Sequence, residues 1–411
     1  MWSLLLCVSV AHASILAPLI PEKCPVHAQG SIEAWSRSPI CSGKSLSSRY
    51  CVFTSSEYNN GHGISVITPP ESSLEILGMI QNSNYYTLRH KHHLTQSQPE
   101  SRSYEVKETP GRGRGVFARQ TIPKGQVFLT GFPALLLDQT FETEIAPKMN
   151  ETERTRLYGA AFEQLPHHQR LSSLATSSGE DGSVYEDIVR TNGFGTGIGT
   201  KGKKYSGIFP EIARLNHGCR PNAIVRFSKT RLSIEAITIR EIQPGEELTI
   251  SYIPPDLPTP IRQSLLKTHY FFTCTCALCS SSSSSSSSPS GNESDENRQR
   301  INQLRSFLES TRHLQPARDA ADELLALAEK EGLDFRMREY LNELMLTFYR
   351  LGDLDGAVGY AEEALRRAVE LGGNSGGGDG GDEEEGEDEF VRAVRANLDV
   401  LRAMRGRERE L

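Results

Sequence analysis

Basic residues are not in excess in this sequence, and its first 20 residues contain no Lys, Arg, Asp or Glu. The 411 residues include 45 Lys and Arg against 52 Asp and Glu, and eight of the acids lie in the run 379–389. The rest of the chain is close to neutral, so we expect no direct specific nucleic-acid binding, which depends on basic surface that neutralises phosphates. With 37% hydrophobic residues, the composition supports a sizeable core and excludes collagen, coiled-coil rods and polytopic membrane proteins.

The uncharged N-terminal stretch predicts a candidate signal peptide over residues 1–13. Residues 4–10 are an apolar run, and Ala-His-Ala at 11–13 resembles a signal-peptidase site. A basic segment ahead of the apolar run is missing, so a buried apolar N-terminus and a wrongly assigned start codon are the alternatives. We expect no transmembrane span, because His12, Ser14 and Pro18 interrupt a stretch already near the minimum length.

Cysteine is sparse, and its distribution is uneven. Of the eight cysteines, four lie in the first 51 residues, Cys219 stands alone, and Cys274, Cys276 and Cys279 have the spacing C-x-C-x-x-C. A secreted disulfide scaffold would be shorter and denser in cysteine, so the late cluster favours a metal site. A closed tetrahedral zinc site needs a fourth ligand. The alternatives are an iron–sulfur cluster, whose standard spacing is missing, and a three-cysteine turn without metal.

Changes in composition divide the chain, whose length at roughly 100–200 residues per domain suggests two to four domains. Short β segments surround a helical pattern at 141–176, nine serines follow Cys279, and apolar residues recur at helical spacing beyond 299. The predicted divisions are 1–13, the candidate signal peptide; 14–102, an N-terminal region of unknown fold with a strand at 64–68; 103–253, a β-rich domain; 254–279, the cysteine segment; 280–298, a serine-rich linker; and 299–411, a helical tetratricopeptide-like region with an acidic low-complexity insert at 372–389.

Three short blocks carry the chemistry. Gly113-Arg114-Gly115 enters a strand, and by itself it predicts a turn, although glycine also lets a backbone approach a cofactor closely. Residues 214–222, R-L-N-H-G-C-R-P-N, form a polar run that is costly to bury without partners. Residues 247–252, E-L-T-I-S-Y, predict a strand that ends in a tyrosine shortly before the cysteine cluster.

These blocks, together with R-G-R-G-V-F-A at 112–118 and Y-F-F-T-C-T-C-A-L-C at 270–279, resemble the SET-domain family of S-adenosylmethionine-dependent protein lysine methyltransferases. The chain most resembles the fungal SMYD-like branch, and the absence of cysteine between residues 130 and 187 indicates that it lacks the MYND finger. The resemblance implies an α+β fold: a SET domain of short β-strands with a helical insert and a zinc-binding post-SET segment, followed by an all-α tetratricopeptide-like C-terminal region.

The resemblance also implies roles for individual residues. Tyr252 is expected to be the catalytic tyrosine, and Tyr270 is expected to line the channel for the target lysine. Gly218 stands where the family usually has Ser, a change that removes no catalytic group. One structural zinc is expected on Cys219, Cys274, Cys276 and Cys279. The residues expected to contact S-adenosyl-L-methionine are Gly113, Arg114, Gly115, Asn192, Asn216, His217 and Phe272, the last by stacking on adenine.

The resemblance therefore predicts a monomeric protein-lysine N-methyltransferase that acts on a histone or non-histone protein in the nucleus or cytoplasm. One alternative is a catalytically silent SET and tetratricopeptide-like module that binds other proteins. A secretory location follows instead if residues 1–13 are a signal peptide. The sequence contains no readable pattern for the target lysine or for the number of methyl groups transferred.

Overall fold

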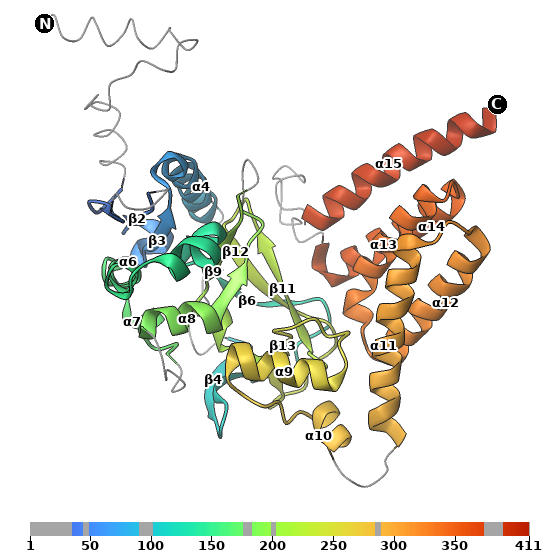
Figure 1. Cartoon of the computed structure of the whole chain (residues 1–411), viewed down its shortest axis with the longest axis horizontal. Helices are drawn as coiled ribbons and strands as arrows, with labels where there is room; N and C mark the ends of the chain where they lie inside the picture. Colours follow the sequence, from blue (N-terminus) through green and yellow to red (C-terminus); the bar gives the residue numbers. More distant parts are fainter. Residues whose placement is uncertain are drawn as a thin grey trace, which may run out of the picture.

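The structure is a computed structural model that describes residues 35–43, 49–89, 102–175, 183–198, 203–283, 289–373 and 389–410. A β-rich body lies beside an all-helical array formed by the C-terminal part of the chain, which confirms the predicted α+β class (Figure 1). The candidate signal peptide at 1–13 lies outside the described residues. No helix in the described ranges combines the length and apolar character needed to cross a membrane.

The described strands of the body form three sheets. A six-stranded sheet contains β1 (Ile40–Cys41), β2 (Cys51–Ser55), β3 (Ile64–Thr68), β7 (Leu135–Asp138), β9 (Tyr205–Ile208) and β8 (Gly193–Gly195) in that order. A four-stranded sheet has β10 (Asn216–His217), β13 (Glu247–Ile250), β5 (Gly113–Ala118) and β4 (Tyr104–Thr109) in that order. The third sheet orders β11 (Ala223–Ser228), β12 (Ser233–Thr238) and β6 (Val127–Gly131).

The N-terminal region at 14–102, to which the sequence assigned no fold, contributes strands to the body where it is described. The strand predicted at 64–68 is β3, and it pairs in parallel with β7 through Ser65 and Leu135. Helix α4 (Pro70–Arg89) covers this part of the sheet, with Ile76 and Ile80 packed in one core with Leu136 of β7. This pairing joins segments about 70 residues apart, so no local pattern in the sequence could predict it.

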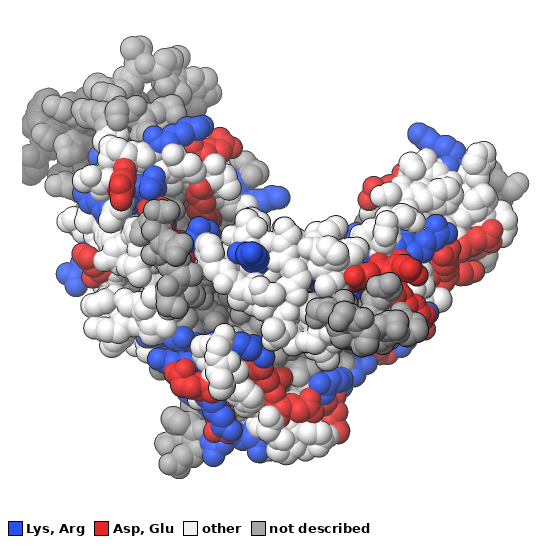
Figure 2. All heavy atoms as spheres, turned by 60° about the horizontal axis from the view of Figure 1, so that its bottom comes forward, with Lys and Arg blue, Asp and Glu red and all other residues white. Residues whose placement is uncertain are grey.

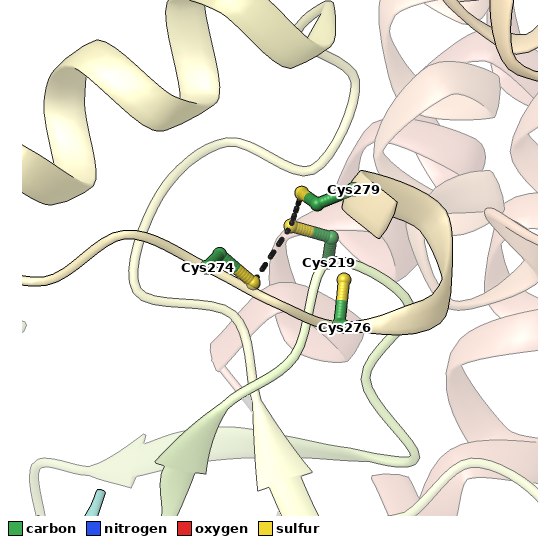
Figure 3. A group of neighbouring side chains, drawn as sticks. All are labelled: Cys219, Cys274, Cys276 and Cys279. Carbon is green, nitrogen blue, oxygen red and sulfur yellow. Dashed lines mark hydrogen bonds between the residues drawn. The ribbon is translucent and has the colours of Figure 1, made fainter. Parts of the chain in front are cut away.

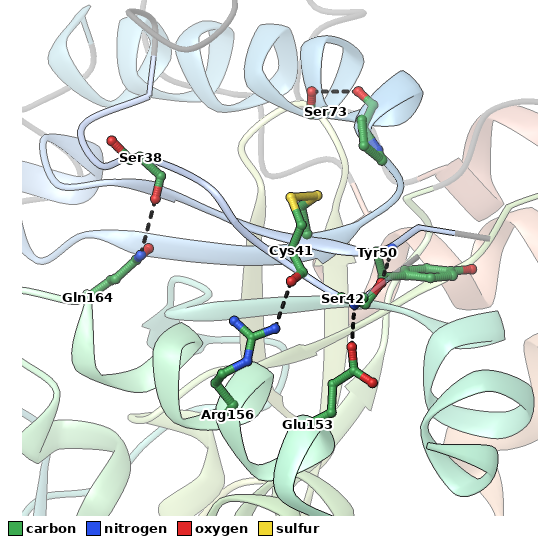
Figure 4. Close-up of a disulfide and its surroundings, with 11 residues drawn as sticks. Ser38, Cys41, Ser42, Tyr50, Ser73, Glu153, Arg156 and Gln164 are labelled. Carbon is green, nitrogen blue, oxygen red and sulfur yellow. Dashed lines mark hydrogen bonds between the residues drawn. A yellow bond between two sulfur atoms is a disulfide. The ribbon is translucent and has the colours of Figure 1, made fainter. Parts of the chain in front are cut away.

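A disulfide between Cys41 and Cys51 joins β1 to β2 (Figure 4). Arg156 of helix α6 (Glu151–Glu163) donates a hydrogen bond to the Cys41 carbonyl at 2.7 Å. Glu153 of the same helix accepts a hydrogen bond from the backbone N–H of Gly43. The first described strands are therefore tied to the helical insert as well as to the sheet.

The helical insert confirms the pattern predicted at 141–176. Asn150 caps α6 by accepting a hydrogen bond from the Glu153 backbone at 2.8 Å, and Ser183 caps α8 in the same way. The described elements of the insert are η2 (Phe141–Ile145), η3 (Ala146–Lys148), α6, α7 (Gln169–Ser172) and α8 (Val184–Asn192).

The stretch 193–207, whose glycines are typical of a loop, contains β8 and the start of β9. A β-carbon on Gly207 would lie 2.8 Å from the Phe209 ring and 3.1 Å from Leu136. Glycine therefore serves close packing in a strand here, which a composition-based reading mistakes for a loop.

Helices follow the SET-like body almost without interruption. Helices α9 (Thr259–Tyr270) and α10 (Ala277–Ser283) precede α11 (Pro289–Ser310), so the segment 280–298, predicted to be a linker, is helical wherever it is described. The array continues through α12 (Leu314–Lys330), η5 (Asp334–Arg336), α13 (Met337–Arg350), α14 (Leu354–Ala368), η6 (Val369–Gly373) and α15 (Glu389–Glu410). Gly352 follows the end of α13 with a φ of 80°, the left-handed conformation that glycine adopts after a helix.

A buried carboxylate, Glu331 at the end of α12, joins the helical array to the body. It accepts hydrogen bonds from Ser294 at 2.5 Å, Asn297 at 2.9 Å and Arg298 at 3.2 Å, and it pairs with Arg220 of the body at 3.5 Å. Arg298 is fully buried, and its two terminal guanidinium nitrogens have no hydrogen-bond partner among the described residues. Glu331 is therefore the carboxylate that compensates the buried charge of Arg298.

A second contact between the two parts lies near the start of α9. Asp256 is buried, and its carboxylate accepts hydrogen bonds from Arg305 at 3.0 Å and Tyr340 at 3.3 Å. Ile224 and Ile239 of the body pack against the apolar core of the array. On the face in Figure 2, charges of both signs are interspersed, and the hollow between the two parts is mainly uncharged.

We predict that Glu331→Ala lowers the free energy of unfolding by about 3 kcal/mol, because it leaves Arg298 buried without a carboxylate. Glu323→Ala, which breaks an exposed ion pair with Arg300, should cost under about 1 kcal/mol. Urea denaturation followed by circular dichroism measures both variants. Equal losses in the two would contradict the role assigned to Glu331.

The loss of stability in Glu331→Ala should depend on pH. Burial alone would raise the pKa of Glu331, but hydrogen bonds from Ser294 and Asn297 and the charge of Arg298 lower it. Because the folded-state pKa is lowered, this stabilisation is present at neutral pH and is lost as the pH falls through that pKa. The difference between the wild type and Glu331→Ala should therefore shrink in acid.

Candidate active site and metal centre

Strand pairing brings together the three sequence blocks that were predicted to carry the chemistry. β10 runs parallel to β13, with Asn216 opposite Thr249 and His217 opposite Ile250. β5, which contains the Gly113-Arg114-Gly115 block, lies on the other side of β13 and pairs with it through Val116 and Leu248. Three segments that span more than a hundred residues of sequence therefore meet around one short strand.

The first residue of β13, Glu247, is the polar centre of this meeting point. Its carboxylate accepts a hydrogen bond from the Asn216 side chain at 2.8 Å and one from Arg112 at 2.9 Å. Arg112 also donates to the His217 carbonyl at 3.4 Å. Sequence reasoning missed Arg112 and Glu247 as site residues, although both stand inside the matching blocks.

Gly115 is required here for space. A β-carbon at this position would lie 2.6 Å from Glu247 Oε1 and 2.9 Å from both the Asn216 amide nitrogen and Thr109 Oγ1. Gly113 differs, because its φ of 67° is the left-handed conformation while its surroundings are open. The two glycines of the block therefore serve two different purposes.

Two residues predicted to contact the cofactor have other partners in this structure. Arg114 is about half exposed and pairs with Glu108 across the β4–β5 hairpin at 3.2 Å. The Asn192 amide donates to the Ile188 carbonyl at 3.0 Å and to Thr191 Oγ1 at 2.8 Å, which closes the end of α8. Arg112, and not Arg114, therefore reaches Glu247, whose carboxylate also binds Asn216.

An aromatic cluster adjoins this polar group. The Tyr252 ring lies 5.0 Å from that of Tyr270, 6.5 Å from that of Phe272 and 5.4 Å from that of His217. The Tyr252 hydroxyl donates to the Leu215 carbonyl at 2.7 Å, and the Tyr270 hydroxyl donates to the Tyr252 carbonyl at 3.2 Å. Burial, followed by the neighbouring Tyr270, raises the pKa of Tyr252, so its hydroxyl stays protonated at neutral pH.

His217 connects the aromatic cluster to the cysteines. Its Nδ1 accepts a hydrogen bond from the Tyr252 backbone at 3.1 Å, so the proton of the neutral ring is on Nε2. Nε2 lies 3.3 Å from Cys219 Sγ and is placed to donate to it. Burial lowers the pKa of His217 to about 4, which keeps the ring neutral at physiological pH.

Cys219, Cys274, Cys276 and Cys279 converge as predicted (Figure 3). Their four sulfurs lie within 4.8 Å of one another, and Cys219 Sγ is 3.8 Å from that of Cys274 and 3.6 Å from that of Cys279. Tetrahedral zinc with Zn–S bonds of about 2.3 Å requires sulfurs about 3.8 Å apart. The four residues therefore fit one closed zinc site, in which Cys219 would supply the fourth sulfur that the C-x-C-x-x-C block lacks.

Buried positive charge beside the sulfurs supports the same assignment. Arg262 is fully buried, its Nη2 lies 3.9 Å from Cys279 Sγ, and its Nε has no hydrogen-bond partner among the described residues. A buried guanidinium needs compensating negative charge. Asp295 Oδ1, which lies 3.9 Å from Arg262 Nη1, supplies part of this charge. Four thiolates around a zinc ion would have a formal charge of −2 and would add to it.

We predict that the purified chain contains about one zinc per molecule and that Cys276→Ser loses it on dialysis against a chelator. The physical reason is that three remaining thiolates no longer close the coordination sphere. Elemental analysis of the dialysed protein measures the metal. The matched control is Cys51→Ser, which removes a disulfide cysteine. Zinc retained by Cys276→Ser would contradict the four-cysteine site.

We predict that Gly115→Ala destabilises the protein by about 1–3 kcal/mol, because the new methyl group displaces the bonded pair of Glu247 and Asn216. Gly359→Ala is the control, since nothing lies within 4 Å of its added β-carbon. Chemical denaturation measures both variants. If Gly115→Ala were as stable as the wild type, Glu247 and Asn216 could make room for a methyl group, and the prediction would be wrong.

The comparisons with known proteins agree with this geometry. The SET domain family model matches residues 113–253. The N-lysine methyltransferase SMYD2 of Gallus gallus is 46% identical over 71 residues, which are 17% of this chain and 16% of that protein. The human SMYD2 is 37% identical over 110 residues, 27% of this chain and 25% of its own length. SMYD2-B of Danio rerio is 33% identical over 150 residues, covering 34% and 32%.

The chain thus spans between about a sixth and a third of the length of the curated relatives that it matches. The matched family region contains β5, β10 and β13, together with Tyr252 and the first zinc-site cysteine. Residues 113–253 of the chain match the SET domain, and the similar proteins named above are N-lysine methyltransferases.

Proposed function

We propose that this protein transfers a methyl group from S-adenosylmethionine to a lysine side chain of a protein substrate. The observation that carries the proposal is the junction of the Asn216–Glu247–Arg112 group with the rings of Tyr252 and Tyr270. Its SET domain and its N-lysine methyltransferase relatives support the proposal. Because the similarity covers only part of each relative, the activity of the whole chain rests on the chemistry of this junction.

The residues at the junction suit the parts of S-adenosylmethionine. Asn216 and Arg112 offer side-chain donors to the carboxylate of its methionine part, and the His217 backbone adjoins them. The glycines of the β5 block keep side chains out of the same space. Phe272 presents a ring for stacking on adenine. When bound, the cofactor supplies a methyl group made electrophilic by its sulfonium centre.

Most of the catalysis assigned to the chain is positioning and electrostatics. The target lysine must attack as a neutral amine, and partly buried aromatic rings around a site lower the pKa of an amine by limiting its hydration. The protonated hydroxyl of Tyr252 and the nearby carbonyl of Leu215 are placed to orient such an amine. Tyr270 fixes this arrangement through its hydrogen bond to the Tyr252 carbonyl.

The zinc site has a structural role in this proposal. It fastens the segment that contains Phe272 to the segment that contains Asn216, through Cys274 and Cys219. The contacts proposed for Arg114 and Asn192 require both side chains to leave their present partners when the cofactor binds. Monomeric action without nucleic-acid binding belongs to the same proposal, and the interspersed charges of Figure 2 support it.

We predict that the zinc-loaded chain binds S-adenosylmethionine with micromolar affinity and transfers labelled methyl groups to protein. Tyr252→Phe should lower kcat by at least about a hundredfold and change the affinity for S-adenosylmethionine little, because the hydroxyl acts in the transition state. Calorimetry and a filter assay with labelled cofactor measure the two quantities.

Tyr349→Phe is the matched control, because Tyr349 is an exposed tyrosine of α13 outside the site. Full activity in Tyr252→Phe would contradict the role of its hydroxyl. Cofactor binding by a wild-type chain that transfers no methyl group would instead favour a silent module that binds proteins.

A further inference from the structure

Phe271 has an unusual backbone conformation at the end of α9. Its φ of 60° and ψ of 28° are left-handed, and it is the C-cap of the helix. Glycine or asparagine usually occupies such a position, because a β-carbon makes it unfavourable. A phenylalanine in this conformation persists only where its surroundings hold it there.

The left-handed turn has a direct consequence for the residues on either side. In a continuing helix, residues two apart point in nearly opposite directions. Here Tyr270 and Phe272 both approach the Tyr252 ring, at 5.0 Å and 6.5 Å between centroids. The conformation of Phe271 therefore decides whether both rings can belong to the aromatic cluster.

A residue of the helical insert, Arg190 of α8, contacts the side chain of Phe271. The Arg190 guanidinium lies 4.3 Å from the centre of the Phe271 ring, which is otherwise 39% exposed. Asp187, one turn earlier on α8, is buried and binds Arg190 at 2.9 Å. The carboxylate thus orients the guanidinium over the ring, in a cation–π contact between two helices.

We propose that Arg190 is a positioning residue: by holding Phe271 in its left-handed conformation, it sets the places of Tyr270 and Phe272 in the site. This inference rests on the proposed function and deepens it, since it links the insert to the rings expected to contact cofactor and lysine. Arg190 touches neither reactant and acts through Phe271. Arg190 and Asn192 belong to the same last turn of α8, so a shift of that turn moves both.

The first test requires no enzymatic activity. Hydrogen exchange of the zinc-loaded full chain is compared between the wild type and Arg190→Ala, in peptides that cover 266–276. We expect exchange at least about threefold faster there and unchanged in α13, because the cation–π contact restrains the turn. Arg300→Ala is the matched control, since Arg300 is equally exposed and pairs with Glu323 far from the site. Unchanged exchange at 266–276 would overturn the inference.

The second test measures cofactor affinity by calorimetry in a double-mutant cycle. Arg190→Ala and Phe271→Leu should each weaken S-adenosylmethionine binding about threefold to tenfold. The double variant should bind the cofactor no more weakly than the weaker-binding of the two single variants. Arg190→Lys, which keeps the charge without the planar face, should recover part of the loss. Simple addition of the two effects would overturn the coupling.

These outcomes separate the inference from the proposed function. A wild-type chain that binds no S-adenosylmethionine contradicts the function, while the exchange experiment still decides whether Arg190 restrains the turn. A wild-type chain that binds the cofactor, with a cycle that shows no coupling, contradicts the inference alone. Methyl transfer by Arg190→Ala should show a raised KM for the cofactor with a smaller change in kcat.

Discussion

The parallel pairing of β10 with β13 is the constraint on which the rest of the site depends. It sets Asn216 beside Glu247 and brings the Tyr252 backbone to His217 Nδ1. The same register sends Cys219 out of the end of β10 toward the cysteines of the post-SET segment. A shift of one residue would turn each of these side chains to the opposite face, so polar group, aromatic cluster and metal site form together or not at all.

Buried charge then ties the post-SET segment and the helical array to this centre. Arg262 lies against the cysteines, and Arg298 and Glu331 form the next layer of the same region. Each of these charges would be costly in the interior without a partner. Arg262 lies beside the sulfurs and beside Asp295 of α11, and Arg298 pairs with Glu331. The helical array is in this way part of the environment of the metal site, beyond any role in recognising a substrate.

The site residues that could be predicted are those that stand in short, recognisable sequence motifs. The spacing of Cys274, Cys276 and Cys279 indicated a metal site by itself, whereas the full set of four cysteines and the roles of the tyrosines and Asn216 came from the resemblance to the SET-domain family. Arg112 was missed because the choice between it and Arg114 depends on which face of the hairpin turns toward Glu247. The strand at 193–195 was missed because glycine marks both loops and close packing.

The sequence by itself determined the order of its blocks, the C-x-C-x-x-C spacing and the helical character of the C-terminal region, because these depend on short-range spacing and periodicity. The α+β class and the fourth cysteine of the expected zinc site followed from its resemblance to the SET-domain family. Only the tertiary structure decided that β1, β2 and β3 extend the sheet of the body and that Glu331 compensates Arg298. It also decided that Arg190 of the insert reaches Phe271. These are contacts between distant segments, and their energy depends on burial and orientation that no local pattern encodes.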